Sequence, residues 1–273
     1  MSGPLRPMLE VLLEPGAIGV VFQPIFECRG GERRLHALES LIRGPKGTNM
    51  ENPEVMLEYA RRKREEPRMD RACMAAALGA ARELPAGVRV CLNVHASTLG
   101  RDPAFVEFLT ATAAASGIAA TRLTVEIVEQ ARPGDNQTFL ASLERLRAAG
   151  LRIALDDIGL GYSNYKMVLD ACPDYFKIDR YFVQGSHADP HRRAVLSSIA
   201  QLARRFGGRA VAEGVEETAD LLAVLAQGID LVQGFIFSPP LPAAGLVEQE
   251  VFGVFPPLPS PKTPARTRSA RRH

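Results

Sequence analysis

The stretch "IALDDIGLGYSN", residues 153–164, joins an apolar run to a charged loop. The apolar run is typical of a buried strand, and it ends in Asp156 and Asp157. The flexible turn Gly159-Leu160-Gly161 follows directly. Two adjacent carboxylates at the end of a buried strand repel each other and lose hydration, so a positive charge should lie beside them. The stretch therefore predicts a charged site at the end of this strand.

Short apolar runs of the same kind recur along the chain. Eight of them predict strands, at residues 19–28, 35–44, 88–96, 123–129, 152–158, 175–179, 209–215 and 231–237. Amphipathic patterns between most of these runs predict helices, for example at 135–150, 191–207 and 218–228. Residues 53–84 predict two helices with a polar break at 61–68.

This order of elements indicates the fold class. Eight strands with helices between them predict a TIM-like (β/α)8 barrel, and a doubly wound open sheet is the alternative. Two strand runs precede the first helix, so the first strand is predicted to pair antiparallel with the second. The predicted domains are a short N-terminal lead at 1–16, a barrel at 17–252 and a disordered tail at 253–273, rich in Pro and Arg.

Composition sets limits on location and partners. The chain has 273 residues, 46% hydrophobic and 23% charged, which is ordinary for a soluble globular protein. The net charge of +2 implies no DNA or RNA partner. Without a run of 18 apolar residues or a signal-peptide pattern, we expect no membrane insertion. Four widely spaced cysteines favour reduced thiols and a cytoplasmic location: Cys28, Cys73, Cys91 and Cys172.

Seven of the eight predicted strands place an acid, an amide or a lysine near the strand end. A single strand Glu is often the structural partner of a Lys or Arg, but seven such strands would converge on one mouth of a barrel. Barrel interiors normally fill with branched apolar side chains, so ionisable groups there need a reason. The residues are Glu39, Asn93, Glu126 with Glu129, Asp156 with Asp157, Lys177, Glu213 and Gln233.

The charges in this set do not balance. Lys177 is the one cation among at least five carboxylates, and divalent metal ions can supply the missing positive charge. Carboxylate and amide oxygens without Cys or a nearby His favour Mg²⁺ or Mn²⁺ over Zn²⁺. Several carboxylates around a pair of metals is an arrangement used for in-line displacement at phosphorus. The sequence therefore predicts a metal site centred on Asp156 and Asp157.

Eight short motifs occur in an order that resembles one protein family. They are "FQPIF" (22–26), "ESLIR" (39–43), "LNVHAS" (92–97), "VEIVE" (125–129), "DDIGLGYSN" (156–164), "FKID" (176–179), "AEGVE" (212–216) and "VQGFIFSPP" (232–240). On these motifs the chain resembles the EAL-domain phosphodiesterases, which hydrolyse the bacterial second messenger cyclic di-GMP. The resemblance covers residues 17–250. It implies hydrolysis to the linear dinucleotide pGpG, with slow further cleavage to GMP.

The resemblance also implies roles for individual residues. Lys177 would position or polarise the attacking water, and Glu213 would act as a base near the second metal. Glu129 would anchor the loop that carries Asp157, a loop that couples metal binding to dimerisation in family members. Arg43 would contact a substrate phosphate, which its forked guanidinium suits. Gln23, Leu41 and Gln233 would line the substrate, and two Mg²⁺ or Mn²⁺ ions would be held by Glu39, Asn93, Glu126, Asp156 and Asp157.

Some features depart from the family pattern. Ile158 stands where Phe is usual, Leu160 where Thr or Ala is common and Asn164 where Ser is common. None of these is an expected metal ligand, so we expect them to affect loop packing and, through it, the rate or dimer coupling. A homodimer is implied by the resemblance. No sensor or cyclase segment is recognised before Met8, so regulation is expected from a separate protein, from dimerisation or from expression level.

Two alternatives to the enzyme stay open at this point. The first is a catalytically silent cyclic di-GMP receptor or a protein-interaction scaffold on the same fold. Such family members generally lack an acidic ligand or the lysine, whereas all nine expected positions are filled here. The second is another metal-dependent barrel enzyme that stabilises an enolate. It gives no account of the glycine-flanked loop or of Arg43.

Overall fold

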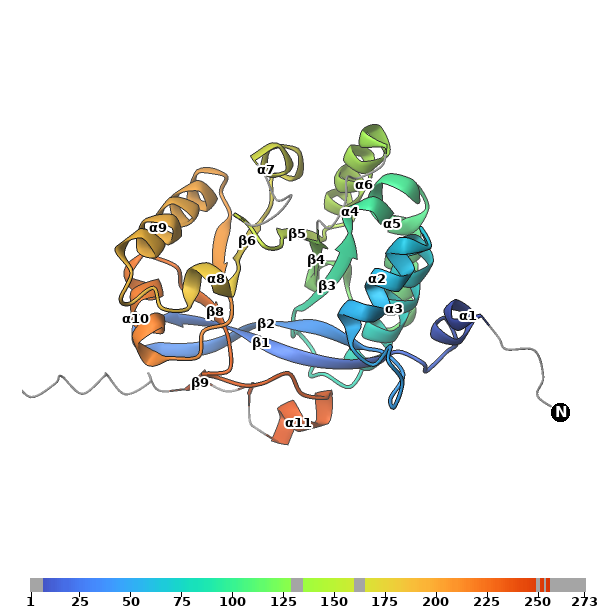
Figure 1. The fold of residues 1–273 in the computed structure, drawn as a ribbon, viewed down its shortest axis with the longest axis horizontal. Helices are drawn as coiled ribbons and strands as arrows, with labels where there is room; N and C mark the ends of the chain where they lie inside the picture. Colours follow the sequence, from blue (N-terminus) through green and yellow to red (C-terminus); the bar gives the residue numbers. More distant parts are fainter. Residues whose placement is uncertain (1–6, 129–134, 160–164, 249–250, 253, 256–273) are drawn as a thin grey trace, which may run out of the picture.

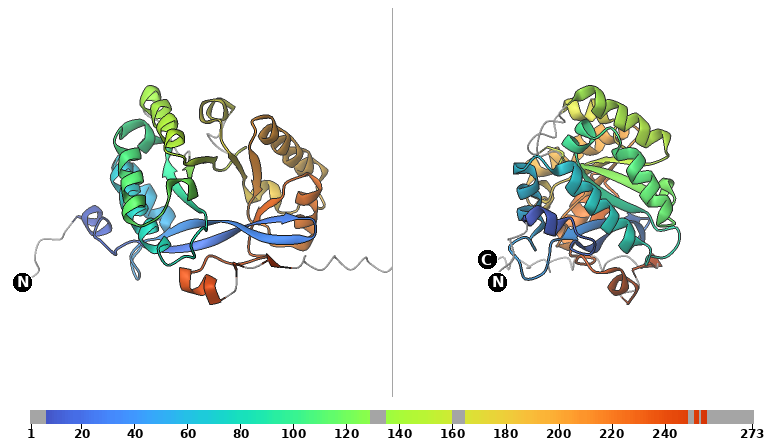
Figure 2. Two further views of the ribbon diagram at one scale, coloured as in Figure 1. Left: turned by 180° about the vertical axis from the view of Figure 1, so that it is seen from behind. Right: turned by 90° about the vertical axis from the view of Figure 1, so that its right-hand side faces the viewer.

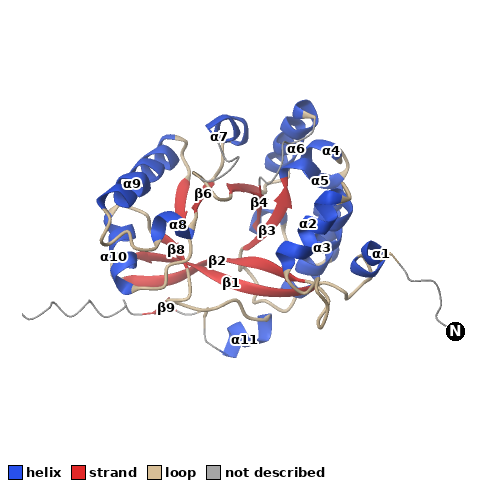
Figure 3. Ribbon diagram, viewed as in Figure 1, coloured by secondary structure: helices blue, strands red, loops and turns tan. Residues whose placement is uncertain are grey.

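Eight strands close into a barrel in the computed structural model, which describes residues 7–128, 135–159, 165–248, 251–252 and 254–255. The strands are β1 (Gly19–Arg29), β2 (Glu32–Arg43), β3 (Val90–His95), β4 (Leu123–Val128), β5 (Arg152–Leu155), β6 (Tyr175–Ile178), β7 (Arg209–Ala212) and β8 (Leu231–Gln233). From β2 to β8 each strand pairs parallel with the next. β1 closes the ring, antiparallel to both β2 and β8 (Figure 3). The predicted barrel with an antiparallel first strand is confirmed, and the open sheet is excluded.

Helices surround this ring on most sides. In Figure 1, α2 to α6 lie to the right of the barrel and α8 to α10 to the left, with α7 above. α11 lies on the other side of the β1–β2 hairpin from these helices, as both views of Figure 2 show. The helices are α1 (Met8–Leu12), α2 (Pro53–Arg62), α3 (Glu66–Ala81), α4 (Ala96–Arg101), α5 (Phe105–Ala115), α6 (Asn136–Ala148), α7 (Tyr165–Ala171), α8 (Arg180–Val183), α9 (Pro190–Arg205), α10 (Thr218–Ala226) and α11 (Ala243–Glu248).

Local sequence signals account for the starts of several helices. Asn52, Asp135 and Asp189 accept backbone N–H bonds at the starts of α2, α6 and α9. The break between α2 and α3 falls at 63–65, where Arg64 adopts a left-handed backbone with φ 59°. The predicted pair of helices with a polar break is therefore confirmed. Within the described ranges, none of the helices combines the length and the hydropathy needed to cross a bilayer.

The chain ends differ in two ways from the sequence-based boundaries. α1 lies inside the predicted lead 1–16, and its Leu9 and Leu12 are buried. A ninth strand, β9 (Val254–Phe255), pairs antiparallel with β2 at Arg33 and Arg34, so the segment predicted as a disordered tail from residue 253 contains a strand. Residues 256–273 of that segment lie outside the described residues. A two-residue strand has too little apolar pattern to be recognised in sequence.

The later strands are also shorter than the apolar runs predicted. Runs at 209–215 and 231–237 contain strands of only four and three residues, at 209–212 and 231–233. The segments after β7 and β8 both turn at a glycine shortly beyond the sheet. These glycines are Gly214, with φ 63°, and Gly234. The Val215 N–H donates to the Gln233 carbonyl (3.1 Å), and the Ile236 N–H donates to the Val215 carbonyl (3.1 Å). These bonds hold the two turns against each other above the barrel.

We expect Gly234→Ala to be strongly destabilising. A Cβ at Gly234 would overlap backbone atoms of Val215. Backbone atoms cannot move aside as the end of a flexible side chain can. The unfolding free energy should fall by at least about 2 kcal/mol, as for an overpacked buried site. Gly79→Ala is the matched control, because a Cβ there meets nothing within 4 Å and Gly79 lies inside α3, so stability should rise by up to about 1 kcal/mol. Urea denaturation of both variants measures the difference, and equal midpoints would contradict the close approach.

A layer of apolar side chains fills the barrel interior. Seven strands each contribute one residue to it. Side chains alternate between the two faces of a strand, so residues two positions further toward the mouth also face the interior. This geometry determines which side chains meet above the layer, whose members are Ile25, Ala37, Cys91, Ala154, Tyr175, Val211 and Leu231.

Candidate metal and catalytic site

The next layer toward the mouth is polar on every strand. Moving two residues along six strands from the apolar layer reaches Glu39, Asn93, Asp156, Lys177, Glu213 and Gln233. β1 runs the other way, so its residue is Gln23, which pairs with Glu39 across the β1–β2 ladder. β4 contributes Glu126, in register with Asn93. The predicted convergence of these side chains is therefore confirmed by the strand registers.

Lys177 lies at the centre of the polar layer. Its side chain is only 2% exposed, and Nζ lies within ion-pair distance of four carboxylates from four different elements. The distances are 2.6 Å to Glu126 Oε2, 2.7 Å to Glu213 Oε1, 3.1 Å to Asp156 Oδ1 and 3.3 Å to Glu39 Oε1. This lysine is the positive charge that the opening stretch required. Asp157 brings the carboxylates of the site to five, so Lys177 alone does not balance them.

Amide side chains orient Glu39 from both sides. Asn93 Nδ2 donates to Glu39 Oε1 (3.0 Å), and Gln233 Nε2 donates to Glu39 Oε2 (2.7 Å). Gln233 Nε2 also reaches Gln23 Oε1 (3.0 Å), and Gln23 donates in turn to the Ser238 carbonyl (3.3 Å). Asn93 and Gln233 therefore fix the Glu39 carboxylate directly, and Gln23 supports it through Gln233. Asn93, Gln23 and Gln233 thus lie together in the polar layer around Glu39.

Burial and crowding change the acidity of these groups. Burial, followed by repulsion from Glu39 and Asp156, raises the pKa of Glu126 to about 8 even though Lys177 is beside it. Burial and Asp156 raise the pKa of Asp157 to about 6. Burial would also raise the pKa of Glu39, but Lys177 and the two amide donors hold it below its usual value. The carboxylates keep the pKa of Lys177 well above its usual value despite burial. Burial, together with repulsion between the carboxylates, thus favours the protonated forms of Glu126 and Asp157.

The loop after β5 and the end of β7 together bring three carboxylates close to one another at the edge of the layer. One oxygen from each of Asp156, Asp157 and Glu213 lies within 4.8 Å of the others. Asp157 adopts a left-handed backbone with φ 52°, which Asp tolerates better than most residues, and it turns a second carboxylate into the site. Ile158 is buried, and its N–H donates to the Lys177 carbonyl (3.1 Å). Oxygens around one Mg²⁺ lie about 3–4 Å apart, so the donor set and its unbalanced charge fit a divalent cation.

A cleft of about 330 Å³ opens beside this layer. Its walls include Glu39, Asn93, Asp156 and Asp157, and the predicted substrate residues Leu41 and Arg43 lie on the β2 side. Gln23 and Gln233 lie next to the cleft through their bonds with Glu39 and with each other. Glu129, predicted to anchor the Asp157 loop, lies outside the described residues, as do Leu160 and Asn164.

Sequence reasoning missed three residues at this cleft. Asp70 of α3 accepts bonds from the N–H (3.0 Å) and Nδ1 (2.8 Å) of His95, and both residues line the cleft. Ser40 Oγ donates to the Cys91 carbonyl (2.7 Å) and holds β2 to β3. His95 could have been found, because it follows Asn93 by two residues and therefore shares its face of the strand. Asp70 lies on a helix with no sequence signal that relates it to the site.

The acidity of this site predicts an unusual dependence of stability on pH. Glu126 and Asp157 hold protons in the folded, metal-free state up to about pH 8 and 6, whereas unfolded carboxyls release them near pH 4 to 4.5. The folded state binds more protons across this window, so its stability should fall as the pH rises from about 5 to 8. Thermal unfolding in the presence of a chelator measures this. Glu126→Gln should flatten the curve, and a wild-type profile that rises over this range would contradict the assignment.

Comparison with known proteins gives a consistent result. The EAL domain family model matches residues 6–240. Among curated proteins, the cyclic di-GMP phosphodiesterase NbdA of Pseudomonas aeruginosa is 32% identical over 232 residues, which are 83% of this chain and 29% of that protein. The cyclic di-GMP phosphodiesterase RocR of the same species is 32% identical over 155 residues, 57% of this chain and 39% of that protein. The chain thus spans well under half the length of either relative.

Solved structures share the fold. A manganese and cyclic di-GMP complex of Klebsiella pneumoniae BlrP1 superimposes with a TM-score of 0.73 at 30% identity, covering 84% of this chain and 57% of that one. A standalone EAL protein from Vibrio cholerae, in its cyclic di-GMP bound form, gives a TM-score of 0.73 at 23% identity and covers 82% of this chain and 92% of that one. The latter likeness concerns the fold alone. With the family model matching residues 6–240, a closed barrel and an inward polar layer built from the family's motifs, the chain belongs to the EAL domain family.

Proposed function

We propose that this EAL domain is a metal-dependent phosphodiesterase that hydrolyses cyclic di-GMP to linear pGpG. The observation that carries the proposal is the polar layer, in which Lys177 faces carboxylates from β2, β4, β5 and the end of β7. The relatives named cyclic di-GMP phosphodiesterases support the choice of substrate. The proposed catalytic unit is the barrel, residues 17–252, acting in the cytoplasm under the control of a separate regulatory protein.

Five side chains are proposed to hold two Mg²⁺ or Mn²⁺ ions. When bound, the cations would lower the pKa of a water and offset the negative charge that develops on the phosphate. The short distances among Asp156, Asp157 and Glu213, and the proton retained by Glu126, support a site built for added positive charge. The proposed ligands are Glu39, Asn93, Glu126, Asp156 and Asp157.

Lys177 and Glu213 are the proposed groups for proton handling. Lys177, whose Nζ lies among the four carboxylates, would use its N–H donors to orient a water for attack on phosphorus. Glu213, 2.7 Å from Nζ in the structure, is placed to accept a proton from that water. The new bond joins the water oxygen to phosphorus while the bond to the 3′ oxygen breaks, and the 3′ oxygen takes a proton. The product carries a 5′ phosphate and a free 3′ hydroxyl, as pGpG requires.

The cleft beside the layer is the proposed substrate site. Arg43 lines the cleft, where its Nη1 donates to the Ile42 carbonyl (2.8 Å). Its guanidinium would contact a phosphate of cyclic di-GMP, since two parallel N–H donors match two phosphate oxygens. Leu41 supplies apolar surface on the same strand. Gln23 and Gln233, joined by a 3.0 Å hydrogen bond, would line the other side. Glu129 is proposed to anchor the loop that carries Asp157.

A second copy of this chain is the proposed partner of the α7 face. Tyr165 is 77% exposed and Leu169 65% exposed, and they lie one turn apart on α7. Tyr165 lines a groove of about 850 Å³ whose walls also include Phe182 and the two residues that follow Asp157, Ile158 and Gly159. Large apolar side chains exposed in one patch are typical of interaction sites. A dimer there would link partner binding to the loop.

Leu169→Asp should therefore weaken self-association at least tenfold, because a buried charge at an apolar contact costs more than 1.4 kcal/mol. Analytical ultracentrifugation over a concentration series measures this. Val247→Asp is the matched control, because Val247 is also an exposed apolar residue (51%), but on α11. Equal association of both variants would remove the α7 face from the proposal.

The function is tested by incubating the purified chain with cyclic di-GMP and Mg²⁺ or Mn²⁺ and separating the nucleotides by chromatography. We expect pGpG to appear with either metal, and to be absent with chelator and in Glu39→Gln. If cyclic di-GMP binds but stays intact with both metals, the protein is a receptor. If it neither binds nor is cleaved, the polar layer serves another substrate and the proposal fails.

A further inference from the structure

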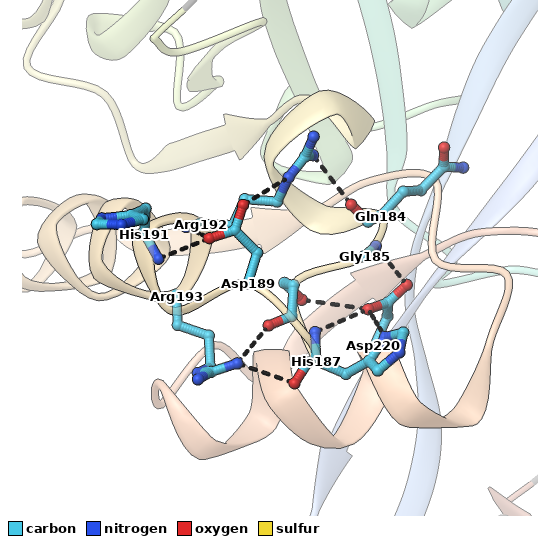
Figure 4. Close-up of polar contacts among 9 residues, drawn as sticks. Gln184, Gly185, His187, Asp189, His191, Arg192, Arg193 and Asp220 are labelled. Carbon is cyan, nitrogen blue, oxygen red and sulfur yellow. Dashed lines mark hydrogen bonds and ion pairs between the residues drawn. The ribbon is translucent and has the colours of Figure 1, made fainter.

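A second buried carboxylate, outside the polar layer, organises the turn after α8. Asp220 of α10 is 3% exposed and accepts four hydrogen bonds from three successive residues (Figure 4). The donors are the N–H groups of Gly185 (2.9 Å) and His187 (3.1 Å), Ser186 Oγ (3.4 Å) and His187 Nδ1 (2.7 Å). Three of these bonds go to Asp220 Oδ1 and the one from the Gly185 N–H goes to Oδ2, so both oxygens of the carboxylate are engaged by the turn.

The hydrogen bonds of Asp220 decide whether the cluster of His187, Glu217 and Asp220 is a metal site or a structural contact. One ligand atom from each of His187, Glu217 and Asp220 lies within 4.8 Å of the others, which is close enough for a metal ion. A cation there would have to displace the His187 Nδ1 proton and compete with three other donors. The bonds instead join α10 to the turn at 185–187, so the cluster is a structural brace between two elements of the barrel.

The braced turn begins directly after Gln184, and the side chain of Gln184 reaches the segment that follows Glu213. Its Nε2 donates to the Gly214 carbonyl (3.1 Å) and to Glu216 Oε1 (3.2 Å). The carbonyl of Gln184 accepts from Arg192 Nη1 (2.9 Å), and the side chain of Asp189 caps α9 beside it (Figure 4). The backbone of Gln184 is therefore fixed by Arg192, and its side-chain amide is bonded to the 214–216 segment.

The segment that Gln184 contacts, residues 214–216, follows Glu213 directly in the chain. β7 ends at Ala212, so the last ladder-like bond is the one from the Glu213 N–H to the Ile178 carbonyl (3.1 Å). Beyond it, Gly214 adopts a left-handed backbone with φ 63°, and a Cβ there would also overlap the side chain of Arg180, so glycine suits this position on both counts. Val215 is bonded to the Gln233 backbone on the β8 side. Gln184 supplies the matching bonds on the β6 side, so the direction of the Glu213 side chain depends on both.

We infer that Gln184 is a positioning residue for Glu213, and that Asp220 acts by holding the turn from which Gln184 reaches. Gln184 donates to the carbonyl of Gly214, the residue after Glu213, and it is not among the described residues that line the cleft. Its effect on catalysis rests on the proposed phosphodiesterase function. Its effect on the 213–216 segment follows from the hydrogen bonds alone.

The test compares Gln184→Leu, which keeps the size but loses the amide, with the wild-type protein. We expect kcat for cyclic di-GMP with Mn²⁺ to fall about tenfold, and KM to stay within about twofold of the wild-type value. A tenfold change in rate corresponds to the loss of roughly one hydrogen bond. Asp220→Ala should lower kcat similarly. The double variant should be no slower than Asp220→Ala, because both residues act through the same bond. Asp102→Ala is the matched control: it removes the pair with Arg71 (2.7 Å) elsewhere in the barrel and should leave kcat unchanged.

Amide hydrogen exchange gives a second readout that does not depend on activity. The amides of 214–216 should exchange faster in Gln184→Leu and stay at the wild-type rate in Asp102→Ala. Unchanged kcat and unchanged exchange in Gln184→Leu would overturn the inference. If the wild-type protein turns over no cyclic di-GMP, the proposed function fails, and the exchange rates still decide the brace: faster exchange supports it and an unchanged rate refutes it.

Discussion

Replacing Lys177 with Met should reduce cyclic di-GMP turnover by at least about a thousandfold, the scale of losing a charged group preorganised at a reacting phosphate. It should also lower the unfolding free energy of the metal-free protein by about 3–5 kcal/mol, because removing one partner of a buried ion pair leaves the others uncompensated. Lys177 Nζ lies within 3.3 Å of four carboxylates, and Met fills its volume without its charge. Activity assays and urea denaturation measure the two effects.

Added Mn²⁺ separates these two effects. If cations bind among the carboxylates, Mn²⁺ should restore much of the stability of Lys177→Met but none of its activity. Arg209→Met is the matched control, because Arg209 bonds Glu27 (2.6 Å) and Asp230 (2.8 Å) at the other end of the barrel. The Arg209→Met variant should be less stable than the wild-type protein, and Mn²⁺ should stabilise both proteins equally. Its turnover of cyclic di-GMP should stay at the wild-type rate. Full activity in Lys177→Met would exclude this lysine from the chemistry.

Asp157→Asn should reduce turnover by about a thousandfold while it makes the metal-free protein more stable at pH 8. Asn tolerates the left-handed backbone of Asp157 (φ 52°), so the loop should keep its shape. Burial and Asp156 raise the pKa of Asp157 to about 6, which means that its charge destabilises the folded state above that pH. Removing the charge removes the penalty and, with it, a proposed cation ligand.

Opposite changes in activity and stability are what distinguish a metal ligand from a structural residue here. Asp70→Asn supplies the comparison, because Asp70 is another carboxylate at the cleft, but it is buried and accepts two bonds from His95. That variant should lose stability. If Asp157→Asn were destabilised at pH 8 like Asp70→Asn, the charge of Asp157 would be balanced in the metal-free protein and the assignment would be wrong.

The polar layer could be predicted from sequence because strand geometry is regular. Glu39, Asn93, Lys177 and Gln233 each follow an interior apolar residue by two positions, so a period-two pattern places all of them on the inner face. The antiparallel first strand also followed from chain order alone, since no helix separates β1 from β2. Motif order then supplied the family. Each of these inferences depends on local periodicity or on spacing along the chain.

Other parts of the molecule depend on contacts between distant segments. Asp70 reaches the cleft only because α3 packs beside the end of β3, and nothing near Asp70 in sequence indicates this. Gln184 and Asp220 are 36 positions apart, and each resembles an ordinary surface polar residue until the turn at 185–187 is seen. The ends of β7 and β8 were overestimated because Val215 and Ile236 continue the apolar pattern after the chain has left the sheet. Burial in these turns gives the same sequence signal as burial in a strand.

The central claim is that the inward carboxylates form a metal centre, and a Mn²⁺ titration followed by electron paramagnetic resonance tests it most directly. Free Mn²⁺ loses its sharp signal on binding, so the spectra count the bound ions per chain. With wild-type protein we predict two bound ions, and with Asp157→Asn the loss of at least one. An absence of binding in the wild-type protein, or the same count in both proteins, would contradict the account.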